Sequence, residues 1–153
     1  MADTELPLLD DELADFVRGA VSITLASCHD LRAPHLARGT GCRVAADRRQ
    51  LTVLLATSAG ADVLTDVRNG GRVAVVFSLP QTHRTLQLKG NDARVVSLEA
   101  DDLALAASYV DAFANGLQAL GYSGAVIRSV LRADAADLVG IRFTPASGSL
   151  QTP

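Results

Sequence analysis

The sequence is poor in the residues that build metal, disulfide and base-stacking sites. It has two cysteines, three histidines, no tryptophan and only 4% aromatic residues. Cys28 and Cys42 show neither a CxxC motif nor a zinc-ligand spacing, so we expect small core thiols and no disulfide. The histidines form no i, i+4 pair, which argues against a metal centre. With so few aromatic side chains to stack on bases, we expect no nucleic-acid partner.

Long hydrophobic runs and a basic leader are also missing. No segment approaches the roughly 20 apolar residues that a membrane span requires. Residues 1–16 are acidic, unlike the basic and then apolar start of a secretory signal. We therefore expect a cytoplasmic protein with no membrane partner.

The composition is that of a globular protein, but the charges are unevenly placed. The 153 residues, 48% of them apolar, suit one well-filled core and predict a single domain. Residues 32–94 hold ten of the fourteen Lys and Arg residues but four of the seventeen Asp and Glu residues. Local positive charge in a chain of net charge −3 favours a site for a small anion. The alternative is a solvated basic edge of a sheet.

Residues 72–90 carry the clearest structural pattern. The apolar run over residues 72–78 predicts a strand buried on both faces. After a break, residues 84–90 alternate with period two, which predicts a second strand. Its leucines face one way, and the opposite, polar face carries Thr85, Gln87 and Lys89.

The remaining periodicities predict further strands and helices. Strands are expected at residues 21–27, 35–44, 51–56, 92–98 and 138–143, followed by a tail of small residues at 144–153. Helices are expected at residues 10–20, from Thr57 or Ser58 to 68, 99–120 and 123–133. Hairpin-length connections favour antiparallel pairing, so the predicted class is α+β, mainly β: an antiparallel barrel with flanking helices.

Two glycines interrupt the strand expected at residues 35–44. Glycine within a strand marks a bulge or the close approach of a ligand. Alternation places Arg38, Thr40 and Cys42 on one face of this strand. Farther on, the helix that begins near Thr57 and Ser58 offers free N–H groups that suit phosphate.

This order of elements resembles the pyridoxamine 5′-phosphate oxidase-like family of FMN-binding split barrels. The resemblance covers residues 12–98 and includes NGGRVAVVFSLP at 69–80 and THRTLQLKG at 82–90; the final strand, 137–145, is also similar. It implies a split barrel formed by residues 21–98 and 137–144, with a helical segment at 99–133. It also implies an FMN cofactor, flavin-dependent oxidoreductase activity on an unknown substrate, and a homodimer with its sites at the subunit interface.

The resemblance assigns the cofactor contacts residue by residue. Arg38 matches a contact on the strand that lines FMN, and Thr57 and Ser58 match the helix start that binds its phosphate. On the strand at 84–90, the assigned contacts are Arg84, Thr85 and Lys89. No catalytic residue is assigned, because the flavin itself carries redox chemistry.

The chain also departs from the family pattern. Residues 59–62 (Ala-Gly-Ala-Asp) stand where a basic pair binds the phosphate, which weakens that site. Lys89 replaces an acid, and we hypothesise that it restores the lost charge. The oxidase's substrate-phosphate arginine and histidine have no match, so pyridoxamine phosphate oxidation is not predicted. The alternative is a non-catalytic dimeric split barrel that has lost FMN or binds a deazaflavin or haem.

Overall fold

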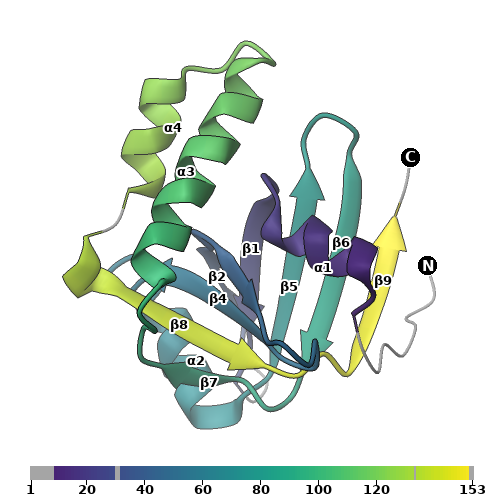
Figure 1. Cartoon of the computed structure of the whole chain (residues 1–153). Helices are drawn as coiled ribbons and strands as arrows, with labels where there is room; N and C mark the ends of the chain where they lie inside the picture. The colour runs from purple at the N-terminus through teal and green to yellow at the C-terminus, as the bar shows by residue number, and fades with distance from the viewer. Residues whose placement is uncertain (1–8, 30–31, 133, 152–153) are drawn as a thin grey trace.

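The computed structural model describes residues 9–29, 32–132 and 134–151, in which nine strands form two antiparallel sheets (Figure 1). The first sheet has the order β2-β1-β5-β6-β9 and the second β3-β4-β8-β7. The strands of the first are β1 Ser22–Ser27, β2 His35–Arg38, β5 Val73–Leu79, β6 Arg84–Gly90 and β9 Ser147–Gln151. Those of the second are β3 Cys42–Val44, β4 Leu51–Ala56, β7 Arg94–Val96 and β8 Leu138–Phe143. The predicted antiparallel α+β barrel is confirmed.

Four α-helices of the described residues flank the sheets: α1 Asp11–Arg18, α2 Ala61–Gly70, α3 Asp102–Gln118 and α4 Gly124–Leu131. A short 3-10 helix, η1 Ala135–Asp137, leads into β8. Helices α3 and α4 form a hairpin that extends toward the same end of the molecule as the β5–β6 hairpin, at the top of Figure 1. None of these four helices could cross a membrane, since none is both long and apolar enough.

The core lies between the inner faces of the two sheets. Ile23, Phe77 and Leu86 lie side by side on three neighbouring strands and are fully buried. The second sheet contributes Phe143 to the same cluster, and α1 contributes Val17. Burial of these large apolar side chains is the main stabilising term of the fold.

Strand β5 is buried on one face only, which corrects the prediction of burial on both faces. Val73, Val75 and Phe77 are buried, whereas Ala74 and Val76 are half-buried. The uniform apolar run hides this alternation, because small and β-branched apolar residues also occur on half-exposed sheet faces.

The single strand predicted over residues 35–44 is two strands in different sheets. β2 ends at Arg38 and β3 begins at Cys42, so the intervening residues carry the chain from one sheet to the other. Gly41 has a φ of 148°. A Cβ on Gly39 would lie 2.7 Å from a side-chain carbon of β1. Glycine therefore serves this crossing through both backbone freedom and close packing.

The crossing gives neighbouring side chains different degrees of exposure. Arg38 is exposed, whereas Thr40 and Cys42 are buried. The prediction that these three residues share a face is wrong, because the alternation of a strand does not continue through the crossing.

Residues 144–153, predicted as a tail of small residues with no strand assigned, contain strand β9. It pairs with β6, and Leu150 lies opposite Leu86. The segment is rich in serine and lacks an alternating apolar pattern, so only backbone hydrogen bonds to a neighbouring strand define it.

The start of α2 also differs from the prediction. The helix ends as expected before Gly71, which has a φ of 70°. Its N-cap is Gly60, and no side chain caps it. The prediction that Thr57 or Ser58 caps this helix is therefore wrong, and both residues lie in the turn between β4 and α2.

Candidate functional site

A groove of about 740 Å³ opens between the α3–α4 hairpin and the first sheet. We call it the Arg38 groove, and its lining residues are Ser22, Arg38, Ser78, Pro80, Gln81, His83, Phe113, Leu117, Leu120, Tyr122, Val126, Ile127, Val130 and Leu131. The wall formed by the helical hairpin is apolar, and Tyr122, Val126 and Val130 are 61%, 61% and 73% exposed. Clustered exposed apolar side chains beside a polar wall indicate a binding surface.

Arg38 supplies the guanidinium of the groove. It is the last residue of β2 and lies opposite Thr24 of β1. Within the described part of the chain, the side chain of Arg38 forms no hydrogen bond or ion pair. A guanidinium without a partner beside an apolar wall suits a planar ligand that carries carbonyl or anionic oxygens.

The polar wall of the groove continues to the β5–β6 turn. Ser78 lines the groove, and its hydroxyl lies 3.0 Å from the hydroxyl of Thr85. Gln81 and His83 come from the turn itself, where His83 has a φ of 57°. Ser78 therefore links Thr85, a predicted cofactor contact, to the groove that Arg38 lines.

The turn between β4 and α2 already binds a carboxylate of the chain. Ser58 donates its backbone N–H to Asp137 Oδ1 at 3.0 Å and its hydroxyl to Oδ2 at 2.5 Å. The backbone N–H of Thr57 donates to the carbonyl oxygen of Asp137 at 2.6 Å. Strand pairing holds Asp137 there, because Leu138 of β8 lies opposite Ala56 of β4. The donors that the resemblance assigns to phosphate therefore serve Asp137.

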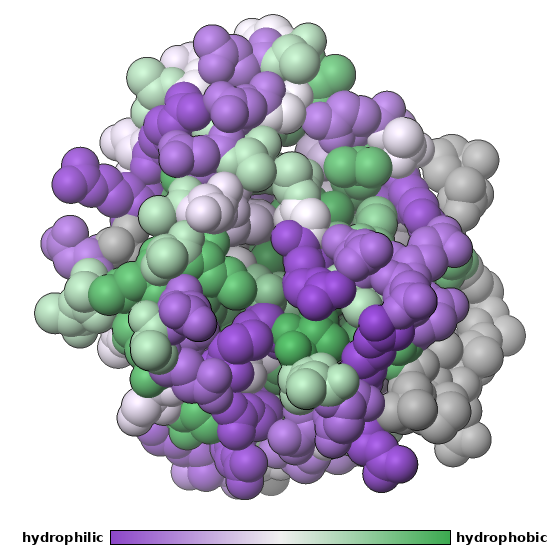
Figure 2. Space-filling model, in the orientation of Figure 1, coloured by the Kyte–Doolittle hydropathy of each residue, from purple (hydrophilic) through white to green (hydrophobic). Residues whose placement is uncertain are grey.

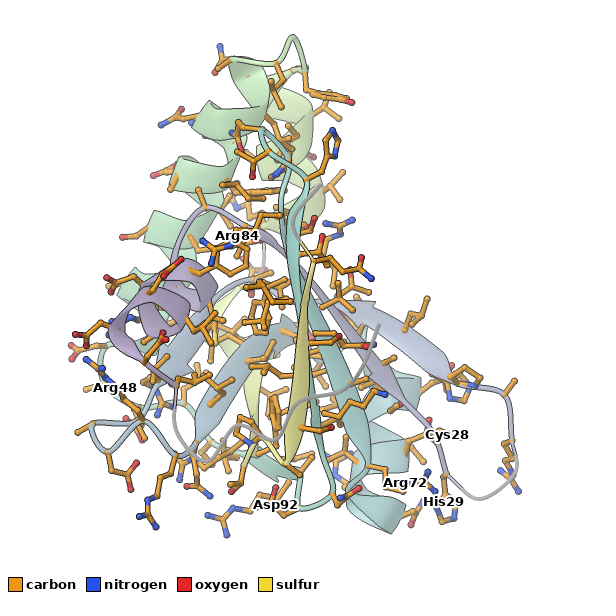
Figure 3. The ribbon with its side chains drawn as sticks, turned by 90° about the vertical axis from the view of Figure 1, so that its right-hand side faces the viewer. Cys28, His29, Arg48, Arg72, Arg84 and Asp92 are labelled. Atoms are coloured by element: carbon orange, nitrogen blue, oxygen red, sulfur yellow. The ribbon has the colours of Figure 1, made fainter. Side chains whose placement is uncertain are left out.

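The predicted contacts on β6 lie on opposite sides of the first sheet. Thr85 and Lys89 alternate with the buried leucines and face outward. Arg84 instead lies beside α1 (Figure 3), where it donates to Glu12 Oε1 at 2.6 Å and lies 5.1 Å from the centroid of the Phe16 ring. The sheet therefore separates Arg84 from the other two predicted contacts.

Lys89 is distant from Arg38 on the outer face of the sheet. The strand register places Arg38 three strands from Gln87, about 14 Å at a strand spacing of about 4.8 Å. Lys89 lies two residues further along β6, and with Arg72 it lines a separate pocket of about 340 Å³. The two cations therefore belong to separate positions and do not form one compact anion site.

Solved structures match this fold, although no protein-family model and no curated protein matches the sequence. A putative pyridoxamine 5′-phosphate oxidase from Lactobacillus delbrueckii is 13% identical, with a TM-score of 0.59 over 97% of this chain and 99% of that one. An F420 reductase is 18% identical, with a TM-score of 0.57 over 88% and 93%. A pyridoxamine 5′-phosphate oxidase-related, FMN-binding protein from Nostoc punctiforme is 17% identical, with a TM-score of 0.50 over 87% and 74%.

The chain has the pyridoxamine 5′-phosphate oxidase-like split-barrel fold. Because these identities lie between 13% and 18%, the likeness establishes the fold and no residue's role. It confirms the fold that the sequence resemblance implies. The assigned cofactor contacts remain predictions about this split barrel.

A polar network ties the edge of the split barrel to α2. Asp66 Oδ2 accepts a hydrogen bond from the Ser27 hydroxyl at 2.8 Å and lies 2.7 Å from His35 Nδ1. The hydrogen bond to Asp66 raises the pKa of His35, with a further contribution from the charge of Asp62. Hydrogen bonds from His35 and Ser27 lower the pKa of Asp66. The network connects β1, β2 and α2 through side chains alone.

We expect this network to make stability depend on pH. A histidine with a raised pKa stabilises the folded state fully below its unfolded value of 6.5, and the contribution is lost as pH rises through the folded pKa. An aspartate with a lowered pKa contributes above its unfolded value of 3.8, and the contribution is lost as pH falls through the folded pKa. The combined contribution is therefore largest between roughly pH 4 and pH 6.5.

Urea unfolding of the wild type and the His35→Gln variant, at about pH 5.5 and about pH 8, measures this contribution. The wild type should lose stability between the two conditions, and the variant should lose less. An equal loss in both proteins would show that His35 is not the titrating group.

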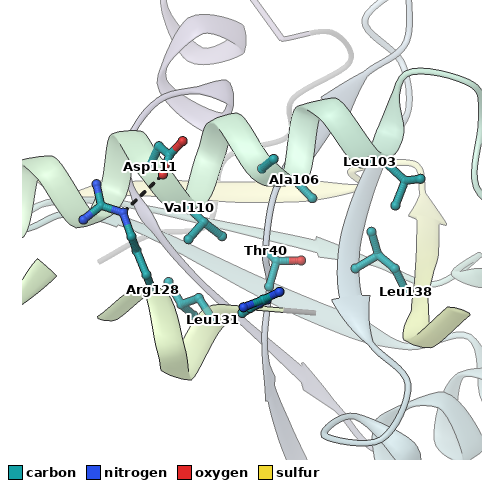
Figure 4. A pocket seen from close by; sticks show the side chains of 10 residues that line it. Thr40, Leu103, Ala106, Val110, Asp111, Arg128, Leu131 and Leu138 are labelled. Carbon is teal, nitrogen blue, oxygen red and sulfur yellow. Dashed lines mark hydrogen bonds and ion pairs between the residues drawn. The ribbon is translucent and has the colours of Figure 1, made fainter. Parts of the chain in front are cut away.

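A second cavity of about 390 Å³ lies between α3, α4 and the start of β8 (Figure 4). An ion pair between Arg128 and Asp111, 3.2 Å long, lies among its lining residues. Thr40 also lines it, but its hydroxyl donates to the carbonyl of Leu54. Figure 2 shows apolar side chains gathered on this side of the molecule, over the lower part of α3. Asp111, Arg128 and Thr40 are thus already paired, whereas the exposed side chain of Arg132, which also lines the cavity, has no partner among the described residues. The cavity of about 390 Å³ is smaller than the Arg38 groove of about 740 Å³.

The thiols and the buried phenol do not form a reactive site. Cys42 is buried, as predicted for a core thiol, and burial raises its pKa to about 12. Burial also raises the pKa of Tyr109, whose hydroxyl donates to the carbonyl of Val21 at 2.6 Å. Cys28 is half-buried, and neither cysteine forms a disulfide. In the described ranges, no cluster of three or more His, Cys, Asp or Glu residues could hold a metal ion.

Two features of the site have weak or no signals in the sequence. Asp137 lies 79 residues from Ser58, and no local pattern connects them. The apolar wall has a partial signal, because residues 123–133 carry apolar side chains on more than one helical face. When one apolar face of such a helix packs on the protein, the other stays exposed and can contact a ligand or partner.

Proposed function

We propose that this split barrel binds a flavin, with FMN as the first candidate, and acts as a flavin-dependent oxidoreductase. The observation that carries the proposal is the Arg38 groove, which sets a guanidinium with no partner among the described residues against an apolar wall, on a fold shared with an FMN-binding protein. The cytoplasmic location and the unknown substrate remain part of the prediction from the sequence.

The lining of the groove suits the ring system of a flavin. A tricyclic ring has apolar faces and one edge rich in carbonyl and nitrogen groups, so it needs an apolar wall and a few convergent polar side chains. Leu117, Tyr122 and Val126 would pack on the ring, and Arg38 would donate to its polar edge. When bound, the flavin would carry the electrons, and the protein would supply binding and orientation.

We propose a homodimer as part of the same function, with the sites at the subunit interface. The outer face of the first sheet supports this proposal because it is only half-buried and carries small or neutral residues such as Thr24, Val76 and Gln87. Leu36, which lies opposite Ala26 of β1, adds exposed apolar surface to this face. The part of this face between Arg38 and Lys89 therefore resembles the centre of protein interfaces, which is depleted in charge.

Titration of FMN with the purified protein tests the cofactor. We expect quenching of flavin fluorescence in the wild type and at least about tenfold weaker binding in Arg38→Ala, since a charge-assisted hydrogen bond contributes about 1.5–3 kcal/mol. The matched control is Arg94→Ala, which removes the same charge from an exposed position on β7 of the other sheet. Unquenched fluorescence in the wild type, or equal affinities of R38A and R94A, would contradict the proposed site.

The second candidate is a split barrel that has lost FMN or binds another cofactor. Two observations favour it. The carboxylate of Asp137 already accepts hydrogen bonds from Ser58 at the turn predicted to bind phosphate, and residues 50–67 contain no Lys or Arg. The F420 reductase of the same fold makes a deazaflavin one alternative, and haem is another. Absorbance spectra recorded after adding each cofactor distinguish these alternatives from a colourless protein that binds none.

A further inference from the structure

We infer that Asp137 is a specificity-determining residue: its carboxylate, bound to Ser58, excludes phosphate from the β4–α2 turn and favours a ligand with an uncharged, hydroxylated tail. The exclusion of phosphate stands on the geometry of the turn. The identity of the favoured ligand as a flavin rests on the proposed function.

Asp137 occupies the donors that an anion would need. Its two carboxylate oxygens accept separately from the backbone N–H and the hydroxyl of Ser58, at 3.0 and 2.5 Å. A phosphate bound at Ser58 requires the same N–H and hydroxyl, because both of these donors point at Asp137. Asp137 therefore acts as an internal anion at Ser58, and phosphate contacts these two donors only by displacing it.

The anchor of Asp137 makes displacement unfavourable. Its carbonyl oxygen accepts from Thr57 at 2.6 Å, and its own N–H donates to the carbonyl of Asp134 at 2.9 Å. The residue that follows it begins the β8 pairing with β4. These backbone bonds keep Asp137 next to the turn, so its carboxylate can return to Ser58 after the side chain rotates away.

The surrounding charge opposes phosphate as well. Residues 50–67 contain no Lys or Arg, and α2 carries Asp62 in its first turn and Asp66 one turn later. A phosphate monoester brings about −1.5 to −2 charges at neutral pH. Adding such a group beside Asp137 places like charges close together, which disfavours binding.

The turn borders the strand that presents Arg38. A Cβ added to Gly60 would lie 3.5 Å from the Cβ of Ala37, which is buried and therefore points to the opposite face of β2 from the exposed Arg38. Because β2 is an edge strand, a ligand whose ring lies in the Arg38 groove can meet Asp137 with a tail that passes around this edge. A polyol tail can donate hydrogen bonds to a carboxylate, whereas a phosphate cannot share the donors of Ser58 with it. Riboflavin is the simplest flavin of this class.

Inorganic phosphate is the probe for the first test, followed through the Ser58 amide resonance in ¹H–¹⁵N spectra. We expect no saturable shift in the wild type and a saturable shift in Asp137→Ser. The control Asp134→Ser removes an exposed carboxylate three residues before Asp137, from a side chain that makes no capping hydrogen bond, and should behave like the wild type. If D137S does not fold, Asp137→Asn replaces it with the same expected direction. A saturable shift in the wild type, or none in either folded Asp137 variant, would overturn the inference.

Parallel titrations with FMN and riboflavin separate this inference from the proposed function. We expect the wild type to bind riboflavin within about threefold of FMN, and D137S to shift the ratio toward FMN at least tenfold. Strong preference of the wild type for FMN would overturn the inference while supporting the proposed function. Failure to bind either flavin would overturn the proposed function and the polyol ligand, and the phosphate titration would still decide the exclusion.

Discussion

Replacing Phe77 by alanine is expected to lower the free energy of unfolding by about 4 kcal/mol. Phe77 is fully buried at the centre of β5, between Ile23 of β1 and Leu86 of β6. Its loss removes the transfer free energy of an aromatic ring and leaves a cavity that three paired strands cannot readily fill. Urea unfolding monitored by circular dichroism measures the change.

The neighbouring residue provides the control for this variant. Val76 lies on the opposite, half-buried face of the same strand, so Val76→Ala keeps the strand but spares the core. We expect it to cost about 1 kcal/mol or less. Similar losses in the two variants would contradict the assignment of the inner and outer faces of β5.

Replacing Asp102 by alanine is expected to cost about 3 kcal/mol. Asp102 is 1% exposed, and both of its carboxylate oxygens accept hydrogen bonds from Arg43, at 2.9 and 3.2 Å. It also accepts from the backbone N–H of Glu99 at 2.7 Å. Alanine removes all of these bonds at the start of α3 and leaves a partly buried guanidinium with fewer partners, which is why the expected cost is large.

The adjacent acid supplies the matched control. Asp101 is exposed, and its side chain makes no capping hydrogen bond to α3. Asp101→Ala therefore removes the same charge next to the same helix and should change stability by about 0.5 kcal/mol or less. Equal midpoints of urea unfolding for D101A and D102A would refute the role given to the Arg43–Asp102 pair.

The elements with a clear apolar period could be predicted from the sequence. The alternation over residues 84–90 gives β6 with its faces assigned correctly, and helical spacing gives α1 and α3 close to their bounds. These signals are local, because a strand or helix with one buried face repeats its apolar residues at its own period. β9 has no such period, since backbone pairing with β6 defines it.

Local sequence patterns predict less of the candidate site than of the fold. The sequence singles out Arg38 and Ser58, and the structure places the turn that holds Ser58 beside β2. It does not place Arg84 or Lys89 with them, because the faces of a strand and its distance along a sheet depend on the whole barrel. The partner of Ser58 lies far along the chain, and β4–β8 pairing alone brings it there.

The sequence by itself therefore determines the antiparallel split barrel, its apolar strands and Arg38 as a candidate ligand-binding residue. Only the tertiary structure decides that Gly39 and Gly41 carry the chain between two sheets and that an aspartate fills the β4–α2 turn. The physical reason is the range of the interactions. Apolar periodicity is written into neighbouring residues, whereas strand pairing and the hydrogen bonds of a turn join residues that only the folded chain brings together.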